Sequence, residues 1–168
     1  MFNTKLSKKA KEKESIIYVS NSLAEKISRS ENKYFAVSSS FLNVELTADI
    51  SEKLLFNIAK KLDKKALLIN CMSGKDVKDE SGVLDKKYIE CLDEKGVKDC
   101  IKENDGYDLV FVSLPSVNVF ANSLEIANIC KNIILIEKCM YTKYKSFEET
   151  LLHLEEKDID ITAVIPIK

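Results

Sequence analysis

Short apolar runs, rich in β-branched and aromatic residues, recur along the chain and alternate with longer segments of helical periodicity. The runs cover residues 34–38, 66–70, 108–113, 132–137 and 161–165. Their apolarity is continuous rather than alternating, which is typical of strands buried on both faces of a parallel sheet. The pattern therefore predicts parallel strands covered by helices.

Amphipathic segments lie between these runs and show apolar positions at helical spacing. These positions are Ile50, Leu54, Leu55, Ile58, Ala59 and Leu62 in the first, Leu84, Tyr88, Ile89 and Leu92 in the second, Phe120, Leu124 and Ala127 in the third, and Phe147, Leu151 and Leu154 in the fourth. Residues 49–52 and 146–149 have the form of capping boxes, so the first and fourth helices are expected to begin there. Gly96 is expected to close the second helix.

Strands and helices that alternate in this way predict the fold class. Parallel neighbours need a crossover connection, and the segments between the runs are long enough to supply it as helices. We therefore predict an α/β fold with a doubly wound, mainly parallel sheet of about five or more strands, flanked by helices in three layers.

The chain has 168 residues, of which 45% are hydrophobic and 32% charged, and this fits a single soluble domain. Residues 1–15 are Lys-rich and nearly devoid of apolar side chains, and residues 22–25 have the form of a capping box. We predict a basic N-terminal arm with a short helix at 1–30 and one α/β domain at 31–168. Such a short helix is not stable alone, so it is expected to dock on its own domain or on a neighbouring subunit.

Charge and hydropathy exclude several classes of function. The chain carries 26 Lys and Arg against 27 Asp and Glu, so a broad basic surface for nucleic acid is not expected. No apolar run approaches the roughly 20 residues that cross a bilayer. The expected location is the cytoplasm, or the inner face of the membrane through a partner.

The cysteines and the single histidine do not form a recognisable reactive site. The cysteines are Cys71, Cys91, Cys100, Cys130 and Cys139. Their number is odd and their spacing irregular, so free and mostly buried thiols are expected rather than disulfides or a zinc site. His153 lies in a helical pattern without a Gly-flanked nucleophile nearby, which argues against a hydrolase.

Function in a doubly wound sheet is expected at the carboxyl ends of the strands. Residues 107–115 read Tyr-Asp-Leu-Val-Phe-Val-Ser-Leu-Pro, residues 64–70 read Lys-Lys-Ala-Leu-Leu-Ile-Asn, and residues 35–39 read Phe-Ala-Val-Ser-Ser. In this order they resemble the motifs Y-D-x-V-I-I-D-T-P-P, k-k-V-L-L-I-D-x-D and V-T-S of the bacterial tyrosine kinases of capsular and exopolysaccharide synthesis, which are MinD/ParA-type P-loop ATPases. The resemblance spans residues 33–166.

The chain departs from this family at each position that carries chemistry. In the family, the backbone N–H groups of a G-E-G-K-S-T loop bind the phosphates, and the Lys of that loop supplies positive charge. The Ser or Thr hydroxyl of the loop and acidic residues at the strand ends hold Mg²⁺. The residues aligned with these positions are Glu45, Leu46, Thr47 and Ala48 in the loop, Asn70 and Met72 after the second strand, and Ser113 after the third. Phosphoryl transfer depends on positioning and charge neutralisation, so these losses remove its mechanism.

The resemblance therefore implies a catalytically inactive domain, with neither ATP nor Mg²⁺ expected as a cofactor and no metal site. The vestigial nucleotide-site positions are Ser39, Ser40, Asn43, Glu45, Thr47, Asn70 and Ser113. The implied role is regulation or interaction in polysaccharide synthesis. The implied partner is a membrane-bound polysaccharide co-polymerase, an active kinase homologue, or a second copy of the chain.

Two other interpretations stay open. One is a divergent ATP-binding kinase or ATPase of the same family, which the absence of Gly and Lys between residues 38 and 49 disfavours. The other is a small-molecule-binding domain with a crevice lined by Ser39, Asn43, Asn70 and Ser113. Lys75 follows Gly74 like the end of a phosphate loop, but no upstream Gly accompanies it and a turn is expected there.

Overall fold

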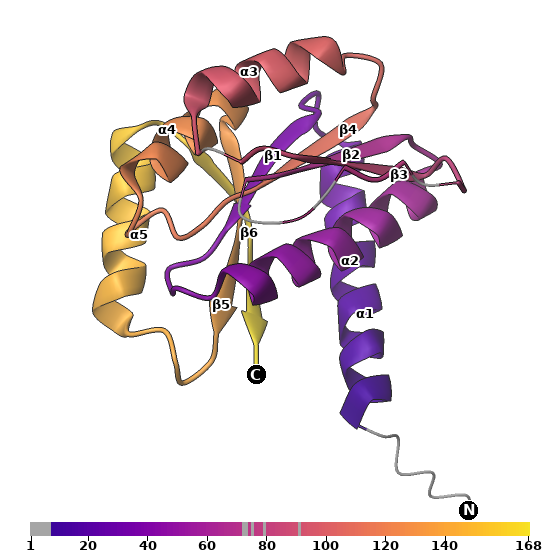
Figure 1. Ribbon diagram of the computed structural model, residues 1–168. Helices are drawn as coiled ribbons and strands as arrows, with labels where there is room; N and C mark the ends of the chain where they lie inside the picture. The colour runs from indigo at the N-terminus through magenta and orange to yellow at the C-terminus, as the bar shows by residue number, and fades with distance from the viewer. Residues whose placement is uncertain (1–7, 72–73, 75, 79, 91) are drawn as a thin grey trace, which may run out of the picture.

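A six-stranded sheet forms the centre of the molecule in the computed structural model, which describes residues 8–71, 74, 76–78, 80–90 and 92–168 (Figure 1). The strands are β1 (Tyr34–Ser38), β2 (Ala66–Asn70), β3 (Leu84–Tyr88), β4 (Leu109–Ser113), β5 (Asn132–Lys138) and β6 (Asp160–Ile167). They lie in the order β3-β2-β4-β1-β5-β6, and every neighbouring pair is parallel. The strands predicted from the apolar runs are confirmed, and the sheet contains β3 in addition.

Helices cover both faces of this sheet. They are α1 (Lys8–Ser28), α2 (Val44–Leu62), α3 (Glu94–Glu103), α4 (Ala121–Cys130) and α5 (Tyr144–Glu156). One hydrophobic cluster joins α1 and α2 to one face, and a second joins α3, α4 and α5 to the other (Figure 1). The predicted three-layer α/β fold is confirmed.

The central strands are apolar because both of their faces are covered. Phe35 of β1 and Phe111 of β4 are fully buried under α2, and their ring centroids are 5.9 Å apart. Leu54, Leu55 and Ile58 of α2 pack in the same cluster. Burial of each of these side chains contributes about 1.5–3 kcal/mol to the free energy of folding. The packed centre of the sheet therefore holds the strands, and with them the residues at their carboxyl ends, in fixed positions.

The helix predicted around Leu84, Tyr88, Ile89 and Leu92 is wrong. Residues 84–88 instead form β3, which pairs along its whole length with β2 at one edge of the sheet. Within this strand only Leu84 is buried, so the strand lacks the continuous apolar run of the other strands. Leu84 and Tyr88 are four positions apart, which is also the spacing of one helical face, but pairing with β2 makes this segment a strand. Gly96 does not end a helix: its amide donates to the Asp93 carboxylate, which caps the start of α3 at 3.0 Å.

The predicted starts of two other helices are also wrong. α2 begins at Val44, where the Asn43 side chain accepts a hydrogen bond from the Leu46 amide at 3.1 Å. Asp49 lies inside the helix and forms an ion pair with Lys53. α5 begins at Tyr144, ahead of the expected capping box, and no side chain caps it.

The N-terminal helix is longer than the capping box at residues 22–25 predicts, since α1 runs through Ser22 without interruption. Its C-terminal half packs on α2 through Leu23, Ala24 and Ile27, which are buried. Lys61 of α2 also donates to the Asn21 carbonyl at 3.2 Å. The helix therefore docks on its own chain, and residues 1–7 of the predicted arm lie outside the described residues.

No helix in the described part of the chain combines the length and the apolarity that crossing a bilayer requires.

Candidate functional site

Because all neighbouring strands are parallel, their carboxyl ends lie together along one side of the sheet, which we call its carboxyl edge. Ser113 of β4 is in register with Asn70 of β2 on one side and Val37 of β1 on the other. The β1 strand leads through residues 39–43 directly into α2. The candidate positions after these three strands therefore lie at neighbouring places on one edge, as the sequence predicts.

The hydroxyl groups at this edge are buried and bonded within the chain. Ser39 donates to the Phe41 carbonyl at 2.7 Å, and its oxygen lies 3.4 Å from that of Thr47. Thr47 in turn donates to the Asn43 carbonyl at 3.1 Å. The Ser113 hydroxyl lies 3.2 Å from that of Ser51. Ser39 and Ser113 thus face protein groups, which argues against their lining an open crevice.

A buried carboxylate closes the β1–α2 loop. Glu137, near the end of β5, accepts hydrogen bonds from the Ser40 amide at 2.8 Å and from the Ser40 hydroxyl at 2.7 Å. Its second oxygen accepts from the Thr142 hydroxyl at 2.9 Å. Thr150 of α5 adds a hydroxyl 2.7 Å from that of Ser40. We call these four residues the Glu137 network, in which neutral donors hold a carboxylate of the chain itself.

The remaining candidate positions lie nearer to solvent. Asn43 is exposed and caps α2, and Glu45 is exposed in the first turn of that helix. An acidic side chain there interacts favourably with the helix dipole but repels a phosphate. Asn70 is half-buried at the end of β2, and Met72 lies outside the described residues.

The chemistry available at this edge differs from that of a phosphate-binding loop. Such a loop offers several backbone N–H groups and a Lys to the anion. Here the Ser40 amide is already bound by Glu137, and residues 39–49 contain neither Gly nor Lys. Among the described residues, no three His, Cys, Asp or Glu side chains lie close enough to share a metal ion.

The sequence pattern does not single out Glu137, Thr142 or Thr150 as site residues. A signal was present, because Glu137 is a charged residue that directly follows the fully buried run Ile133, Ile134, Leu135 and Ile136. A charged residue is rarely buried unless it has partners. Thr142 is five residues away, but Ser40 is 97 residues away, so the pattern along the chain does not reveal that contact.

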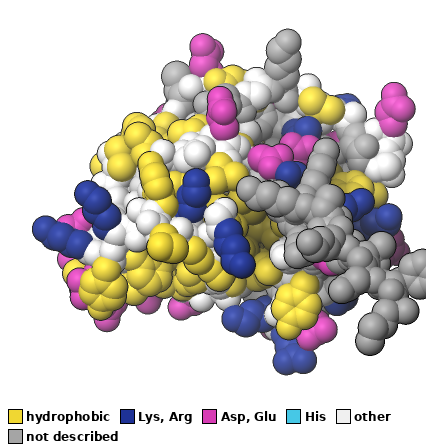
Figure 2. Space-filling model, turned by 90° about the horizontal axis from the view of Figure 1, so that it is seen from below, with side chains coloured by type: hydrophobic (Ala, Val, Ile, Leu, Met, Phe, Trp, Pro, Cys, Tyr) yellow, Lys and Arg dark blue, Asp and Glu magenta, His cyan; other side chains and the backbone are white. Residues whose placement is uncertain are grey.

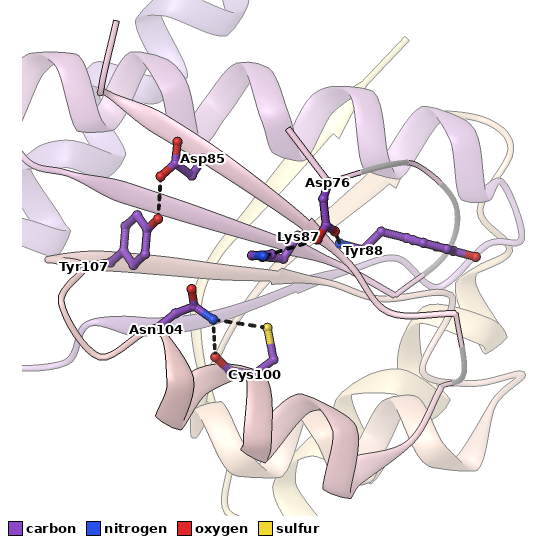
Figure 3. A network of polar contacts seen from close by, with 7 residues as sticks. All are labelled: Asp76, Asp85, Lys87, Tyr88, Cys100, Asn104 and Tyr107. Atoms are coloured by element: carbon purple, nitrogen blue, oxygen red, sulfur yellow. Dashed lines mark hydrogen bonds and ion pairs between the residues drawn. The ribbon is translucent and has the colours of Figure 1, made fainter. Parts of the chain in front are cut away.

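A second polar network fixes the edge strand β3 (Figure 3). The Asp76 carboxylate accepts from the Tyr88 amide at 2.7 Å and from Lys87 at 3.2 Å, and these bonds lower the pKa of Asp76. The Tyr107 hydroxyl donates to Asp85. Burial, followed by this bond to Asp85, raises the pKa of Tyr107 to about 12. We call these five residues the β3-edge network; they tie β3 to the β2–β3 loop and to the α3–β4 loop.

The cysteines that the structure describes are free thiols. Cys71 and Cys130 are buried, Cys100 is partly buried and Cys139 is exposed, while Cys91 lies outside the described residues. Burial raises the pKa of Cys71 and of Cys130 to about 12. Such thiols are poor nucleophiles at neutral pH. His153 is half-buried in α5, so the helical pattern predicted around it is confirmed.

Comparison with known proteins gives matches of structure alone. No protein-family model matches the sequence, and no curated protein matches it either. The kinase domain of the Escherichia coli tyrosine kinase ETK is similar with a TM-score of 0.75 at 15% identity, covering 92% of this chain and 74% of that one. The VpsO kinase domain has a TM-score of 0.76 at 14% identity, covering 94% and 96%.

The cell division protein MinD of Aquifex aeolicus is a further match, with a TM-score of 0.59 at 18% identity, covering 81% of this chain and 70% of MinD. Identities this low establish a common fold and leave the chemistry to the site itself. The fold that the strand motifs predict by their resemblance to bacterial tyrosine kinases is thus confirmed. The chain has the fold of bacterial tyrosine kinase domains and of MinD.

Proposed function

We propose that this chain is a catalytically inactive tyrosine-kinase-like domain that acts as a regulatory or interaction module in capsular or exopolysaccharide biosynthesis. The fold and the strand motifs support the kinase relationship. The observation that carries the loss of nucleotide chemistry is the contact of the Glu137 carboxylate with the Ser40 amide and hydroxyl.

This contact opposes phosphate binding for a simple electrostatic reason. A phosphate that approached the Ser40 amide would have to displace Glu137, and the buried carboxylate would then lose its hydrogen bonds. No Lys in residues 39–49 offsets the phosphate charge, and Glu45 adds a negative charge beside it. The metal-side acids are replaced by Asn70 and Ser113, so Mg²⁺ would gain little at the strand ends.

A domain that keeps the sheet and helices of a kinase but lacks its catalytic groups can still act by binding another protein through its surface. The partner class that the resemblance implies is a membrane-bound polysaccharide co-polymerase or an active kinase homologue. The domain would meet it at the cytoplasmic face of the membrane. Self-association is the alternative, and light scattering on the full chain distinguishes a monomer from an oligomer.

Isothermal titration of the full chain with Mg-ATP and Mg-ADP tests the proposal, with an active kinase domain of the same fold titrated as the positive control. We expect no heat of binding in the micromolar range. A Kd below about 10 µM, on the order of −7 kcal/mol, would overturn the inactive assignment. Formation of phosphotyrosine by the isolated chain would overturn it as well.

A further inference from the structure

The strand β6 is the longest of the six strands, and it lies at one end of the strand order (Figure 1). Its residues 160–167 read Asp-Ile-Thr-Ala-Val-Ile-Pro-Ile, and the side chains of Ile161 and Val164 are exposed. A long apolar strand at a sheet edge offers its unpaired backbone groups to a strand of another chain. The outer edge of β6 is therefore a place where this sheet could continue into a second molecule.

The backbone groups of β6 alternate between β5 and the outer edge. The Cys139 amide donates to the Ile167 carbonyl at 2.7 Å, so the backbone groups of Ile167 face β5. Successive residues of a strand direct their N–H and C=O groups to opposite sides. The backbone groups of Pro166 and Val164 therefore face outward. Thr162 is skipped in the register between β5 and β6, which marks a bulge at that residue.

Two residues change what this outer edge can offer. Lys26, in the last turn of α1, donates from its ammonium group to the Thr162 carbonyl at 2.9 Å. That acceptor is thus engaged within the chain. Pro166 has no N–H group, so it cannot donate to a strand placed outside β6.

Lys26 and Pro166 act on the same hydrogen bond. Two copies that met through β6 under two-fold symmetry would pair as antiparallel strands. With the symmetry axis at Val164, residue 166 of one copy lies opposite residue 162 of the other, because the numbers of opposing residues have a constant sum. The bond from the residue 166 amide to the residue 162 carbonyl would lack its donor, and Lys26 already occupies its acceptor.

The opposite edge of the sheet is engaged by the chain itself. Val77 and Lys86 exchange two backbone hydrogen bonds, of 2.9 and 2.7 Å, beside β3. The Tyr88 amide donates to the Asp76 carboxylate at 2.7 Å. The amides of Lys86 and Tyr88 are therefore bonded within the chain, so β6 is the edge at which pairing with a second copy depends on single residues.

We propose that Lys26 and Pro166 together prevent β6 from pairing with β6 of a second copy of this chain. The helix α1 thus protects the sheet edge in addition to packing on α2. A partner protein would then contact helices and loops rather than add a strand to the sheet. Edge protection of this kind does not depend on the proposed function, because it follows from backbone pairing alone.

Sedimentation velocity over a range of concentrations tests the proposal on the full chain, on Lys26→Ala, on Pro166→Val and on the double variant. Each single variant still lacks a free acceptor or a donor, so we expect it to behave as the wild type. The double variant regains both, and its association constant should rise at least about tenfold. Lys98→Ala is the matched control, since Lys98 is also an exposed lysine but belongs to α3, and it should behave as the wild type.

A third substitution and a second readout locate the contact. Val164→Lys added to the double variant should restore wild-type behaviour, because like charges directly opposite each other destabilise an antiparallel pair. Hydrogen exchange reports on the strand itself. In the wild type the outward Val164 amide should exchange faster than the Ile165 amide, which faces β5, and in the double variant the Val164 amide should become protected.

A second copy docked at the carboxyl edge would give a different result. Figure 2 views the molecule from that end and shows exposed hydrophobic side chains with charged side chains among them. Leu42, Met140 and Tyr144 are exposed there. Association through these side chains would not depend on Lys26 or Pro166, and it would leave the Val164 amide unprotected.

Several results would overturn the proposal. They are unchanged association in the double variant, full association in either single variant, the same rise in Lys98→Ala, and association of the double variant without protection of Val164. Exchange of the wild-type Val164 amide as slow as that of Ile165 would also overturn it, and this measurement requires no variant to fold.

Discussion

The Glu137 network lies at the carboxyl end of the inner strand β5 and the β3-edge network lies on the edge strand β3, and the two polar clusters are built differently. Glu137 is buried and held by an amide and hydroxyl groups of Ser40 and Thr142. Asp76 in the β3-edge network is exposed and shares its bonds with an amide and Lys87. Water can replace the partners of Asp76 but cannot easily reach those of Glu137.

This difference in burial implies that the two networks contribute unequally to stability. A buried carboxylate costs much free energy if a partner is lost, so the Glu137 network holds the β1–α2 loop in one conformation. An exposed ion pair contributes about 0–1 kcal/mol and mainly aligns the edge strand. The β1–α2 loop is therefore held more firmly than the β3 edge strand.

Replacing Glu137 should give the largest effect. Glu137→Ala leaves the Ser40 amide and the Thr142 hydroxyl without their acceptor, and we expect the free energy of unfolding to fall by about 3 kcal/mol. Urea denaturation measures this change. Glu137→Gln is the matched control, because its amide oxygen can still accept from Ser40, and it should cost about 1 kcal/mol. Equal losses in both variants would contradict the role assigned to the buried acceptor.

Removing one hydroxyl from the Glu137 network should have an intermediate effect. Thr150→Val keeps the shape of the side chain but removes the contact with the Ser40 hydroxyl, so we expect a loss of about 1–2 kcal/mol in the same assay. A neutral result would mean that Thr150 does not support the loop.

The corresponding change at the β3 edge should be smaller. Tyr107→Phe removes the hydrogen bond to Asp85 while keeping the ring under Lys65, whose ammonium lies 4.6 Å from the ring centre. We expect a loss of about 0.5–1 kcal/mol, because Asp85 stays partly accessible to water. A loss as large as that of Glu137→Ala would remove the contrast between the two networks.

The pH dependence of Asp76 should be the smallest effect. The Tyr88 amide, followed by Lys87, lowers the pKa of Asp76 in the folded chain. The stability it contributes is therefore complete above the pKa of the unfolded chain, and is lost as the pH falls through the lowered folded value. Asp76→Asn should lower the Tm by about 1 °C at neutral pH and leave it unchanged in strong acid. A difference that persists in acid would contradict this linkage.

The thiols give an independent check of the core. Cys71 and Cys130, whose pKa burial raises to about 12, should react with a thiol reagent only after unfolding, whereas exposed Cys139 should react at once. Site-resolved mass spectrometry measures this order. Rapid labelling of Cys130 in the folded chain would contradict its burial. Reduction with dithiothreitol should leave the Tm unchanged, since the described cysteines are free.

Much of the fold could be predicted because it depends on burial. Residues 66–69 and 133–136 are apolar without interruption, and such short runs are typical of strands covered on both faces. The β3 strand escaped prediction because one edge and part of its faces meet solvent, so Asp85, Lys86 and Lys87 give it a polar composition. Its position is decided by pairing with β2, which the local sequence does not encode.

The candidate site could be predicted only in part. Parallel strands place Ser39, Asn70 and Ser113 at one edge whatever their side chains do, so their grouping follows from the strand pattern. Ser39 bonds to residues close to it in sequence, whereas Ser113 contacts Ser51, which is 62 positions away. The contact between Ser40 and Glu137 spans 97 positions, and no local rule reveals it.

The amide resonance of Ser40 tests the central claim most directly. In a ¹H–¹⁵N spectrum of the wild-type chain, Mg-ATP at saturating concentration should leave the Ser40 amide and the amides of Glu45 and Leu46 unmoved, because Glu137 and the α2 cap hold this loop closed. The Glu137→Gln variant should move the Ser40 amide without any nucleotide. Movement of the wild-type Ser40 amide with Mg-ATP, saturating below about 10 µM, would contradict the account.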